Sequence, residues 1–420
     1  MEVKNGYKKT EIGIVPIDWK LESYGNVFMF LKTAAYSRSQ IFESGEIQYV
    51  HYGDIHTKLL HFLDFIKVDL PKIRKEQLKS YNLLKEGDLI MADASEDYEG
   101  VGKSVEVKNI DNKIAISGLH TFLLRGKEEL ISNGFKGYLH SNSLIKLQFD
   151  RLATGLKVYG ISKNNLKTVL IPLPTLPEQQ AIATVLSDID NLIQALEKQI
   201  TKKLIIKKGV MQMIFTPKEG WRIERLPDIC WFQEGPGLRN WQFTKSGIKV
   251  INVTNLVNGY LDLSNTDRYI SMREFEKMYK HFEIDEGDIV MASSGNSYSK
   301  VAIVRKQDLR LVMNTSVIRF KPLKGLDYNY LLTFLKSNNF KKQIDLLITG
   351  GAQPNFGPAH LKLIHLPVPP KHEEQVQIAN VISSMDSEIE VLEKKLSKYK
   401  LLKRSLIQNL LTGKIRLLKS

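Results

Sequence analysis

Residues 178–218 read EQQAIATVLSDIDNLIQALEKQITKKLIIKKGVMQMIFTPK, and residues 374–414 read EQVQIANVISSMDSEIEVLEKKLSKYKLLKRSLIQNLLTGK. At an offset of 196 residues, 16 of these 41 positions are identical. Each copy follows a proline-rich segment, Ile171–Pro174 or Leu366–Pro369. The repeating unit is far longer than a solenoid repeat, so it indicates a duplication rather than an array. The chain is therefore predicted to consist of two equivalent halves.

Both copies carry the apolar pattern of a coiled-coil helix. Apolar residues recur at alternating steps of four and three, which is a heptad seam. Pro217 and Gly413 follow the two patterns, as expected after the end of a helix. Each copy is predicted to form one helix of about 38 residues, roughly 57 Å long. The residues expected in the helix–helix contact are Ile182, Leu186, Ile189, Ile193 and Leu196 in the first helix and Ile378, Ile382, Met385, Ile389 and Leu392 in the second.

Charge is polarised along both predicted helices. Residues 178–197 carry a net charge of −4 and residues 198–218 carry +6, while residues 373–393 carry −6 and residues 394–420 carry +9. Antiparallel pairing places each acidic half beside the basic half of the other helix, whereas parallel pairing places like charges together. Exposed ion pairs contribute little stability singly, so the pattern selects orientation more than strength. We therefore expect the helices to pair antiparallel.

The regions outside the helices also resemble each other. Lys85–Ala92 is similar to Asp285–Ala292, and Trp19 and Trp221 stand near the two starts. We expect an α+β fold in which two similar globular domains are joined by two long antiparallel helices, as a pseudo-twofold internal repeat. The expected boundaries are 1–174 and 218–369 for the domains, and 175–217 and 370–420 for the helical segments.

Length and composition narrow the class of protein. The chain has 420 residues, a formal net charge of +14 and 43% hydrophobic residues, which are values of a globular protein with more than one domain. Its one cysteine, Cys230, is expected to be a buried thiol in a reducing compartment and excludes a disulfide framework. No apolar run approaches the roughly 18–20 residues of a membrane span, and the N-terminus lacks a secretory signal. We expect a cytoplasmic protein without membrane contact, with nucleic acid as the first partner to consider.

The sequence lacks the motifs of enzymes that modify or translocate DNA. There is no Asn/Asp/Ser-Pro-Pro-aromatic loop of an amino-methyltransferase, and no G-x-x-x-x-G-K-S/T phosphate loop. Glu106 and Lys108, which follow acidic residues, leave a metal-dependent nuclease as an alternative, although the second half has no acid at the matching place. His51, His56 and His61 are spaced by five, which does not align them on one helix face, so no metal site is expected.

Taken together, these features resemble the specificity subunit of type I restriction–modification enzymes. The resemblance rests on the Ile/Leu-Pro-x-Pro segments, on the E-Q-x-x-I-A-x-V motif that starts at Glu178 and at Glu374, and on the occurrence of the whole arrangement twice over essentially the full chain. It implies two target-recognition domains, each reading one part of a bipartite double-stranded DNA target. It also implies that the helices form a coiled coil, set the spacer between the two parts, and dock modification subunits through the seam residues named above.

The resemblance places the chemistry on other chains. Two modification (methyltransferase) subunits would hold S-adenosylmethionine and methylate adenine, and restriction subunits would cut and translocate the DNA. This chain would be non-catalytic, with no cofactor of its own. One departure concerns the family's Gly-x-x-Gln pattern, which Gly350–Gln353 matches closely but Gly155–Val158 does not.

Polar loops supply the candidate DNA-binding residues. Base edges are read by polar side chains, and phosphates are bound by Lys, Arg and hydroxyl groups. Loops 93–104 and 293–300 follow matching strand-like runs yet differ in chemistry, as two domains with different half-sites should. With two further polar loops and the Gly-x-x-Gln segment, the candidates are Lys32, Arg38, Gln40, Ser95, Tyr98, Lys103, Ser104, Arg239, Asn240, Gln242, Ser294, Asn296, Tyr298, Lys300 and Gln353.

The residues alone also allow a coiled-coil scaffold with no role in DNA binding. Such a scaffold has no measurable affinity for DNA even at low salt. A DNA-binding protein instead shows an affinity whose logarithm falls linearly with the logarithm of the salt concentration.

Overall fold

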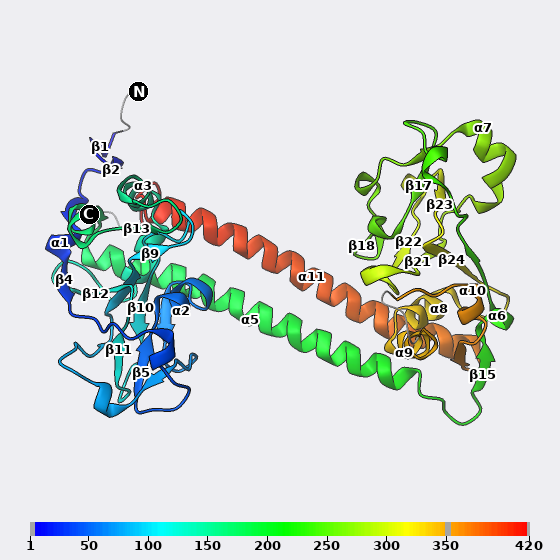
Figure 1. Cartoon of the computed structure of the whole chain (residues 1–420), viewed down its shortest axis with the longest axis horizontal. Coiled ribbons are helices and arrows are strands. Elements are labelled where there is room, and N and C mark those ends of the chain that lie inside the picture. Colours follow the sequence, from blue (N-terminus) through cyan, green and yellow to red (C-terminus); the bar gives the residue numbers. More distant parts are fainter. Residues whose placement is uncertain (1–4, 349–353, 418–420) are drawn as a thin grey trace. The chain divides into compact units, whose positions relative to one another are not determined.

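The computed structural model describes residues 5–348 and 354–417. The chain divides into two compact units, residues 1–197 with 395–420 and residues 198–394. Two long helices, α5 (Leu176–Ile214) and α11 (His372–Leu410), each contribute one half to each unit (Figure 1). The expected pair of long helices is thereby confirmed, with 39 residues in each.

The first unit contains a five-stranded sheet and a smaller three-stranded sheet. The order of the larger sheet is β4 (Phe28–Leu31), β12 (Thr121–Gly126), β8 (Leu89–Ala92), β10 (Ser104–Lys108) and β6 (Phe62–Asp64). Neighbouring strands are antiparallel except β10 and β6. The smaller sheet has the order β11 (Ala115–Ser117), β5 (Ile47–Val50) and β7 (Lys72–Ile73).

The second unit repeats this strand order and adds one strand at the edge of its larger sheet. Its larger sheet has the order β16 (Cys230–Glu234), β24 (Val317–Pro322), β21 (Ile289–Ala292), β22 (Val301–Ile303), β19 (Tyr260–Leu261) and β18 (Leu256–Val257). Its three-stranded sheet consists of β23 (Leu311–Met313), β17 (Ile248–Ile251) and β20 (Tyr269–Ile270). The sheet orders therefore confirm the duplication and the α+β class.

Shorter elements complete the two units. In the first they are β1 (Tyr7–Thr10), β2 (Gly13–Pro16), α1 (Tyr24–Val27), α2 (Tyr52–Thr57), β9 (Ala94–Ser95), α3 (Ser143–Leu152), β13 (Tyr159–Gly160) and α4 (Lys163–Thr168). In the second they are α6 (Leu226–Ile229), α7 (Met272–Glu274), α8 (Tyr328–Leu335), α9 (Asn338–Leu347) and α10 (Pro358–Leu361).

The proline-rich segments are strands that return to the start of each domain. β14 (Leu170–Leu173) pairs antiparallel with β3 (Lys20–Ser23), and β25 (His365–Val368) pairs antiparallel with β15 (Arg222–Arg225). Proline lacks a backbone donor, so it is tolerated in such two-stranded edges. The last strand of each domain thus pairs with a strand near the start of that domain, immediately before a long helix begins.

The heptad seam is mostly buried. The seam residues in the core of their unit are Ile182, Leu186, Ile189, Ile193, Leu196, Ile382 and Ile389, whereas Ile378, Met385 and Leu392 are half-buried. In the first unit, Ile182 and Leu186 share one core with Trp19 and Leu410. The seam therefore serves both the helix pair and the packing of the helices against the domain.

Ion pairs between the helices confirm the antiparallel orientation. In the first unit, Asp190 contacts Lys403 at 2.5 Å and Glu197 contacts Lys400 at 2.7 Å. In the second unit, Lys203 contacts Glu388 at 2.5 Å and Lys207 pairs with Asp386. Within each unit, residues further along α5 pair with residues earlier in α11. These pairs join the acidic half of one helix to the basic half of the other, as the charge pattern predicts.

Candidate nucleic-acid interface

The glutamine of each E-Q motif anchors a long helix to its domain. The buried Gln179 side chain accepts a hydrogen bond from the Ser132 backbone N–H at 2.9 Å and donates to the Leu130 carbonyl at 2.9 Å. In the second unit, Gln375 accepts from Asp327 N–H at 2.8 Å and donates to the Gly325 carbonyl at 3.2 Å. The two glutamines bind backbone groups at corresponding positions of the two domains. The motif therefore sets where each domain stands on its helix.

A buried aspartate stabilises the turn before each central strand. Asp88 accepts from the Lys85 N–H at 2.8 Å and pairs with Arg125 at 2.7 Å. Asp288 accepts from the Asp285 N–H at 2.9 Å, with Arg319 and Lys321 as its cations. The preceding glycines, Gly87 and Gly287, have φ of +77° and +83°, a conformation that favours glycine. These residues are structural, and they position strands β8 and β21, which lead into the two candidate loops.

Part of the first candidate loop is turned into the protein. Asp97 accepts from the Gly100 N–H at 2.6 Å, and the Tyr98 ring packs on Tyr159 with centroids 4.0 Å apart. The Lys103 ammonium donates to the His56 carbonyl at 2.9 Å, and partial burial lowers its pKa. Tyr98 is exposed and Lys103 is half-buried, so these two can face a ligand.

Two serines of this region are not on the surface. Ser95 and Ser104 are both buried, and Ser104 is wholly enclosed on strand β10. The Ser104 hydroxyl lies 3.4 Å from His140 Nδ1. The prediction that Ser95 and Ser104 lie on an exposed loop is therefore wrong, because Ser95 lies on the short strand β9, which pairs with β13, and strand β10 begins at Ser104.

A cavity of about 750 Å³ lies beside the first candidate loop. Its wall includes Ser95 and Lys103 together with His56, His120 and His140. His56 Nε2 lies 2.9 Å from the Ala94 carbonyl, and His120 contacts Asp93 at 3.3 Å, so both rings are already engaged. Within residues 5–348 and 354–417, no group of three or more His, Cys, Asp or Glu residues is arranged to hold a metal ion.

The second candidate loop leaves two polar side chains free to approach a ligand. Asn296 and Lys300 are exposed, whereas Ser294 is half-buried. The half-buried Tyr298 donates its hydroxyl hydrogen bond to Asp345 at 2.6 Å and has the Lys341 ammonium above its ring. Tyr298 is thus tied to helix α9.

The candidate glutamines of the remaining polar loops close tight turns. Gln40 accepts from the Ser37 N–H at 3.0 Å, and Gln242 accepts from the Arg239 N–H at 2.8 Å. Gln242 is also buried, so the prediction that it is an exposed base-reading residue is wrong: its amide oxygen accepts inside the turn, and its amide nitrogen donates to Glu274 and Tyr279. The exposed candidates in these loops are Lys32, Arg38, Gln40, Arg239 and Asn240, while Gln353 lies outside the described residues.

Glu106, the carboxylate on which the nuclease alternative depends, is buried inside the first unit. Glu106 is buried and accepts hydrogen bonds from the Gly134 N–H at 2.6 Å and the Gly137 N–H at 2.8 Å, with Lys136 3.9 Å away. Burial raises the pKa of Glu106. Lys108 lies over the Phe62 ring, with its nitrogen 3.6 Å from the centroid. Glu106 therefore joins strand β10 to the turn at Gly134 and Gly137, which follows strand β12, and does not face a substrate.

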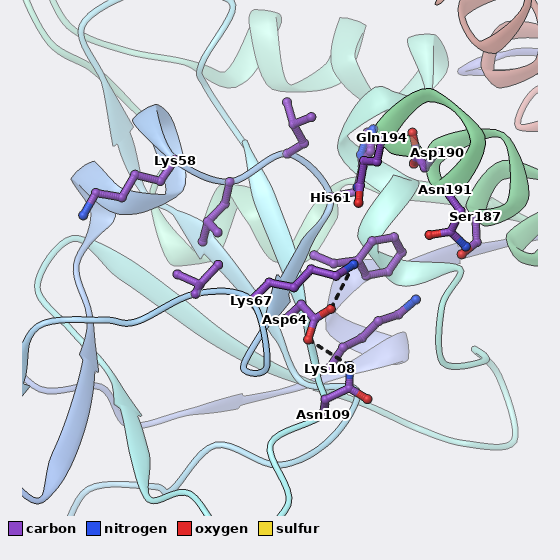
Figure 2. Close-up of a pocket in the computed structure, with 14 residues that line it drawn as sticks. Lys58, His61, Asp64, Lys67, Lys108, Asn109, Ser187, Asp190, Asn191 and Gln194 are labelled. Carbon is purple, nitrogen blue, oxygen red and sulfur yellow. Dashed lines mark hydrogen bonds and ion pairs between the residues drawn. The ribbon is translucent and has the colours of Figure 1, made fainter. Parts of the chain in front are cut away.

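Figure 2 shows a second cavity of the first unit, about 460 Å³, between the domain and helix α5. Asp64 pairs there with Lys67 at 3.2 Å and accepts from the Asn109 amide at 2.9 Å, while α5 contributes Ser187 and Asp190. Its charged groups already have partners, so the cavity separates two packed elements rather than forming a reaction site.

Two buried histidines pack against each other in the first unit: His61 lines this cavity, and His140 lines the cavity beside the first candidate loop. The His61 ring lies 4.6 Å from Tyr138 and 5.1 Å from His140, between centroids, and its Nδ1 has no hydrogen-bond partner. Burial, reinforced by Lys403, lowers the pKa of His61 to about 3, and burial also lowers the pKa of His140. Both rings are therefore neutral. Cys230 of the second unit is also buried, as expected, and burial raises its pKa to about 12.

One exposed aromatic residue lies between two candidate residues but is not among the candidates predicted from the sequence. Trp241 lies between Asn240 and Gln242, and 81% of its surface is exposed. The signal was present in the sequence, since a tryptophan flanked by polar residues in a loop has no apolar periodicity that would assign it to a core. No described helix is long and apolar enough to cross a membrane.

Comparison with known proteins places the chain in a family. Residues 16–205 and 218–400 each match the model of the type I restriction modification DNA specificity domain. The MjaVIII specificity subunit of Methanocaldococcus jannaschii is 26% identical, with 96% of this chain and 94% of that protein aligned. The EcoKI specificity subunit of Escherichia coli K12 is 22% identical, over 96% and 90% of the two chains.

The fold is also found among solved structures. The type I restriction–modification S subunit from M. genitalium superposes with a TM-score of 0.55 at 15% identity, covering 98% of both chains. A chain from a structural study of assembly and conformational transition of the type I restriction–modification system gives a TM-score of 0.62, covering 96% of this chain and 99% of that one. Because both halves match the specificity model, the chain belongs to the DNA-specificity subunit family of type I restriction–modification systems, whose members are non-catalytic.

Proposed function

We propose that this specificity subunit reads a bipartite double-stranded DNA target, with one half-site contacted by each domain. The observation that carries this proposal is that the two domains share their central strand order but differ in loop chemistry. Strands β8 and β21 occupy the same place in their sheets, yet the loop after β8 presents Tyr98 and Lys103 and the loop after β21 presents Asn296 and Lys300. Corresponding strands that present different side chains suit two different base sequences.

Within this proposal the accessible candidates divide by domain. The first half-site is contacted by Lys32, Arg38, Gln40, Tyr98 and Lys103, and the second by Arg239, Asn240, Ser294, Asn296 and Lys300. The domains correspond to residues 1–174 and 218–369, and the helical segments 175–217 and 370–420 keep the two half-sites apart. The DNA between the half-sites is spanned without being read.

Two modification subunits dock on the helices, one in each half. Support comes from a pair of apolar residues that both copies expose at the same repeat position. Ile205 and Ile206 are 65% and 45% exposed, and Leu401 and Leu402, 196 residues later, are 64% and 43% exposed. Matching exposure at matching positions suits two copies of one partner, since apolar surface held in water marks an interaction site.

The remaining functions belong to the partners. In this family S-adenosylmethionine binds to the methyltransferase subunit. We infer that adenine methylation occurs on the docked modification subunits, that restriction subunits join the same complex, and that the complex works in the cytoplasm, where the host DNA is.

The test combines methylation mapping with binding. Sequencing of methylated adenines in DNA from cells that express this chain with its modification subunits should give one split motif. The assembled complex should then bind a duplex that carries the motif and discriminate against duplexes in which either half-site is scrambled. Asn296→Ala should weaken discrimination at one half-site and Tyr98→Ala at the other. A DNA-independent scaffold would instead give no binding at low salt and no motif.

A further inference from the structure

The two domains contain the same tight turn, with different residues at its tip. In the first, the turn Arg38–Gln40 follows β4 and is closed by the hydrogen bond from Ser37 N–H to Gln40. In the second, the turn Asn240–Gln242 follows β16 and is closed in the same way from Arg239 to Gln242. The middle residue of the turn is Ser39 in the first domain and Trp241 in the second.

The second turn is held firmly beneath its tip. The Gln242 amide donates to Glu274 at 2.5 Å and to the Tyr279 hydroxyl at 2.9 Å, which ties the turn to the α7 region. The next residue, Phe243, is half-buried with the Arg268 guanidinium 5.1 Å from its ring centroid. Only the tip is free, and 81% of the Trp241 surface is exposed. A large ring held in water on a rigid turn loses little side-chain entropy when it binds.

The chain around this ring is basic. Residues 235–261 contain no Asp or Glu, and the exposed Arg239 and Lys245 flank the turn. The nearest acid in contact with the turn, Glu274, is already engaged by Gln242. An aromatic ring framed by cations and by the Asn240 amide offers stacking together with phosphate contacts, which is the combination that nucleic acid requires.

We propose that Trp241 packs against a base step of the second half-site, as an apolar wedge that partly unstacks it. This inference rests on the proposed DNA-reading function and deepens it, because it makes recognition asymmetric. The first domain, with Ser39 at the same tip, contacts its half-site without a wedge. Flexible steps are unstacked at lower cost than stiff ones, so Trp241 confers a preference at that step through DNA deformability.

The experiment compares Trp241→Ala and Trp241→Phe with Trp231→Phe and Ser39→Ala in complexes assembled with the modification subunits. Affinity is measured for the intact target, a target with the first half-site scrambled, and a target with the second scrambled. Trp241→Ala should lower affinity for the intact target about tenfold. It should also shrink discrimination at the second half-site and leave discrimination at the first unchanged, while the phenylalanine variant keeps part of both.

A fluorescence measurement reports the contact directly. Binding of the intact target should quench tryptophan emission in the wild-type complex and in Trp231→Phe, and the quenching should be lost in Trp241→Phe. Unchanged second-half discrimination in a well-assembled Trp241→Ala complex would overturn the wedge and leave the proposed function standing. A folded Trp241→Ala chain that no longer assembles would overturn it too, by making Trp241 a subunit contact. A wild-type complex that discriminates neither half would overturn both proposals.

Discussion

The guanidinium of Arg416 forms a bidentate ion pair with the carboxylate of Glu178, which lies 238 residues earlier in the chain. Arg416 Nε donates to Glu178 Oε1 at 2.7 Å and Nη2 donates to Oε2 at 2.8 Å. The same guanidinium donates to both oxygens of Asp18, at 2.8 and 2.6 Å, and Trp19 Nε1 donates to Glu178 at 3.2 Å. The segment after helix α11 therefore ties the start of α5 to the start of the first domain through Arg416.

Removal of this guanidinium should destabilise the first unit. Arg416→Ala leaves the Glu178 carboxylate, only 1% exposed, without its cation, and we expect the free energy of unfolding to fall by about 2 kcal/mol. Urea unfolding checks this value. Lys414→Ala is the matched control, because Lys414 is exposed nearby and its side chain has no such partner. Equal stability of the two variants would contradict the structural role of Arg416.

The two glutamine anchors should have the same energetic value. Gln179→Ala and Gln375→Ala each leave a buried backbone N–H and carbonyl without a side-chain partner, so each should cost about 1–3 kcal/mol. Thermal unfolding of the single variants and of the pair measures these costs. Gln180→Ala and Gln377→Ala, at exposed positions one and two residues further on, should cost little. An effect confined to one anchor would argue against their equivalence.

The buried histidines predict acid sensitivity of the first unit. His61 has a folded pKa of about 3, below the value of about 6.5 of an unfolded chain, so the unfolded state binds more protons between these values. Its contribution is present in full above pH 6.5 and is lost as the pH falls towards 3. His140 acts in the same direction. The urea midpoint of the wild-type chain should therefore fall between pH 7 and pH 5.

A variant at this site separates the cause from general acid denaturation. His61→Gln should be less stable than the wild type at pH 7, and its urea midpoint should change less between pH 7 and pH 5. A variant with the wild-type pH slope would show that other groups determine the acid response.

Each modification subunit should dock on its own pair of apolar residues, so substitutions should remove the two subunits separately. Changing both Ile205 and Ile206 to Ser should remove one modification subunit, and changing both Leu401 and Leu402 to Ser should remove the other. Native mass spectrometry gives the stoichiometry. Val391→Ser is the control, because Val391 is exposed on the same helix but its repeat counterpart is Ala195. Retention of both subunits by either double variant would contradict this docking surface.

The length of the helices should set the gap between half-sites. Insertion of one heptad after Glu197 and one after Lys394 preserves the seam and lengthens each helix by about 10 Å, or about three base pairs of DNA. Methylation sequencing should then show a longer gap with unchanged half-sites. An insertion variant that folds, assembles and keeps the original gap would contradict the spacer role.

Periodicity and duplication predict most of this fold from sequence, because they depend on residues that are close in the chain. The seam from Ile182 and the charge order along α5 and α11 needed no knowledge of the domains. The site was harder to predict, because a polar residue in a polar stretch looks the same whether it faces water or completes a turn. Ser104 is buried on strand β10, and the Gln242 amide donates to Glu274 and Tyr279.

Long-range partners explain the other omissions. Arg416 looks like one more basic residue of a basic tail until Asp18 and Glu178 are seen beside it. The E-Q motif indicates the start of a helix. The role of Gln179 in anchoring that helix becomes visible only in the structure, where its side chain binds the Leu130 carbonyl and the Ser132 N–H.

The division of the chain into units has a consequence for biosynthesis. The second unit is one continuous segment, residues 198–394, whereas the first needs both residues 1–197 and residues 395–420. On a ribosome the N-terminal domain emerges first, yet the segment that completes it, with Lys403 and Arg416, is made only after the whole of the second unit. The second unit can therefore complete its contacts while the first still lacks part of its core. The order of assembly would then be the reverse of the order of synthesis, and a chain that stops before residue 395 would be left with one finished half.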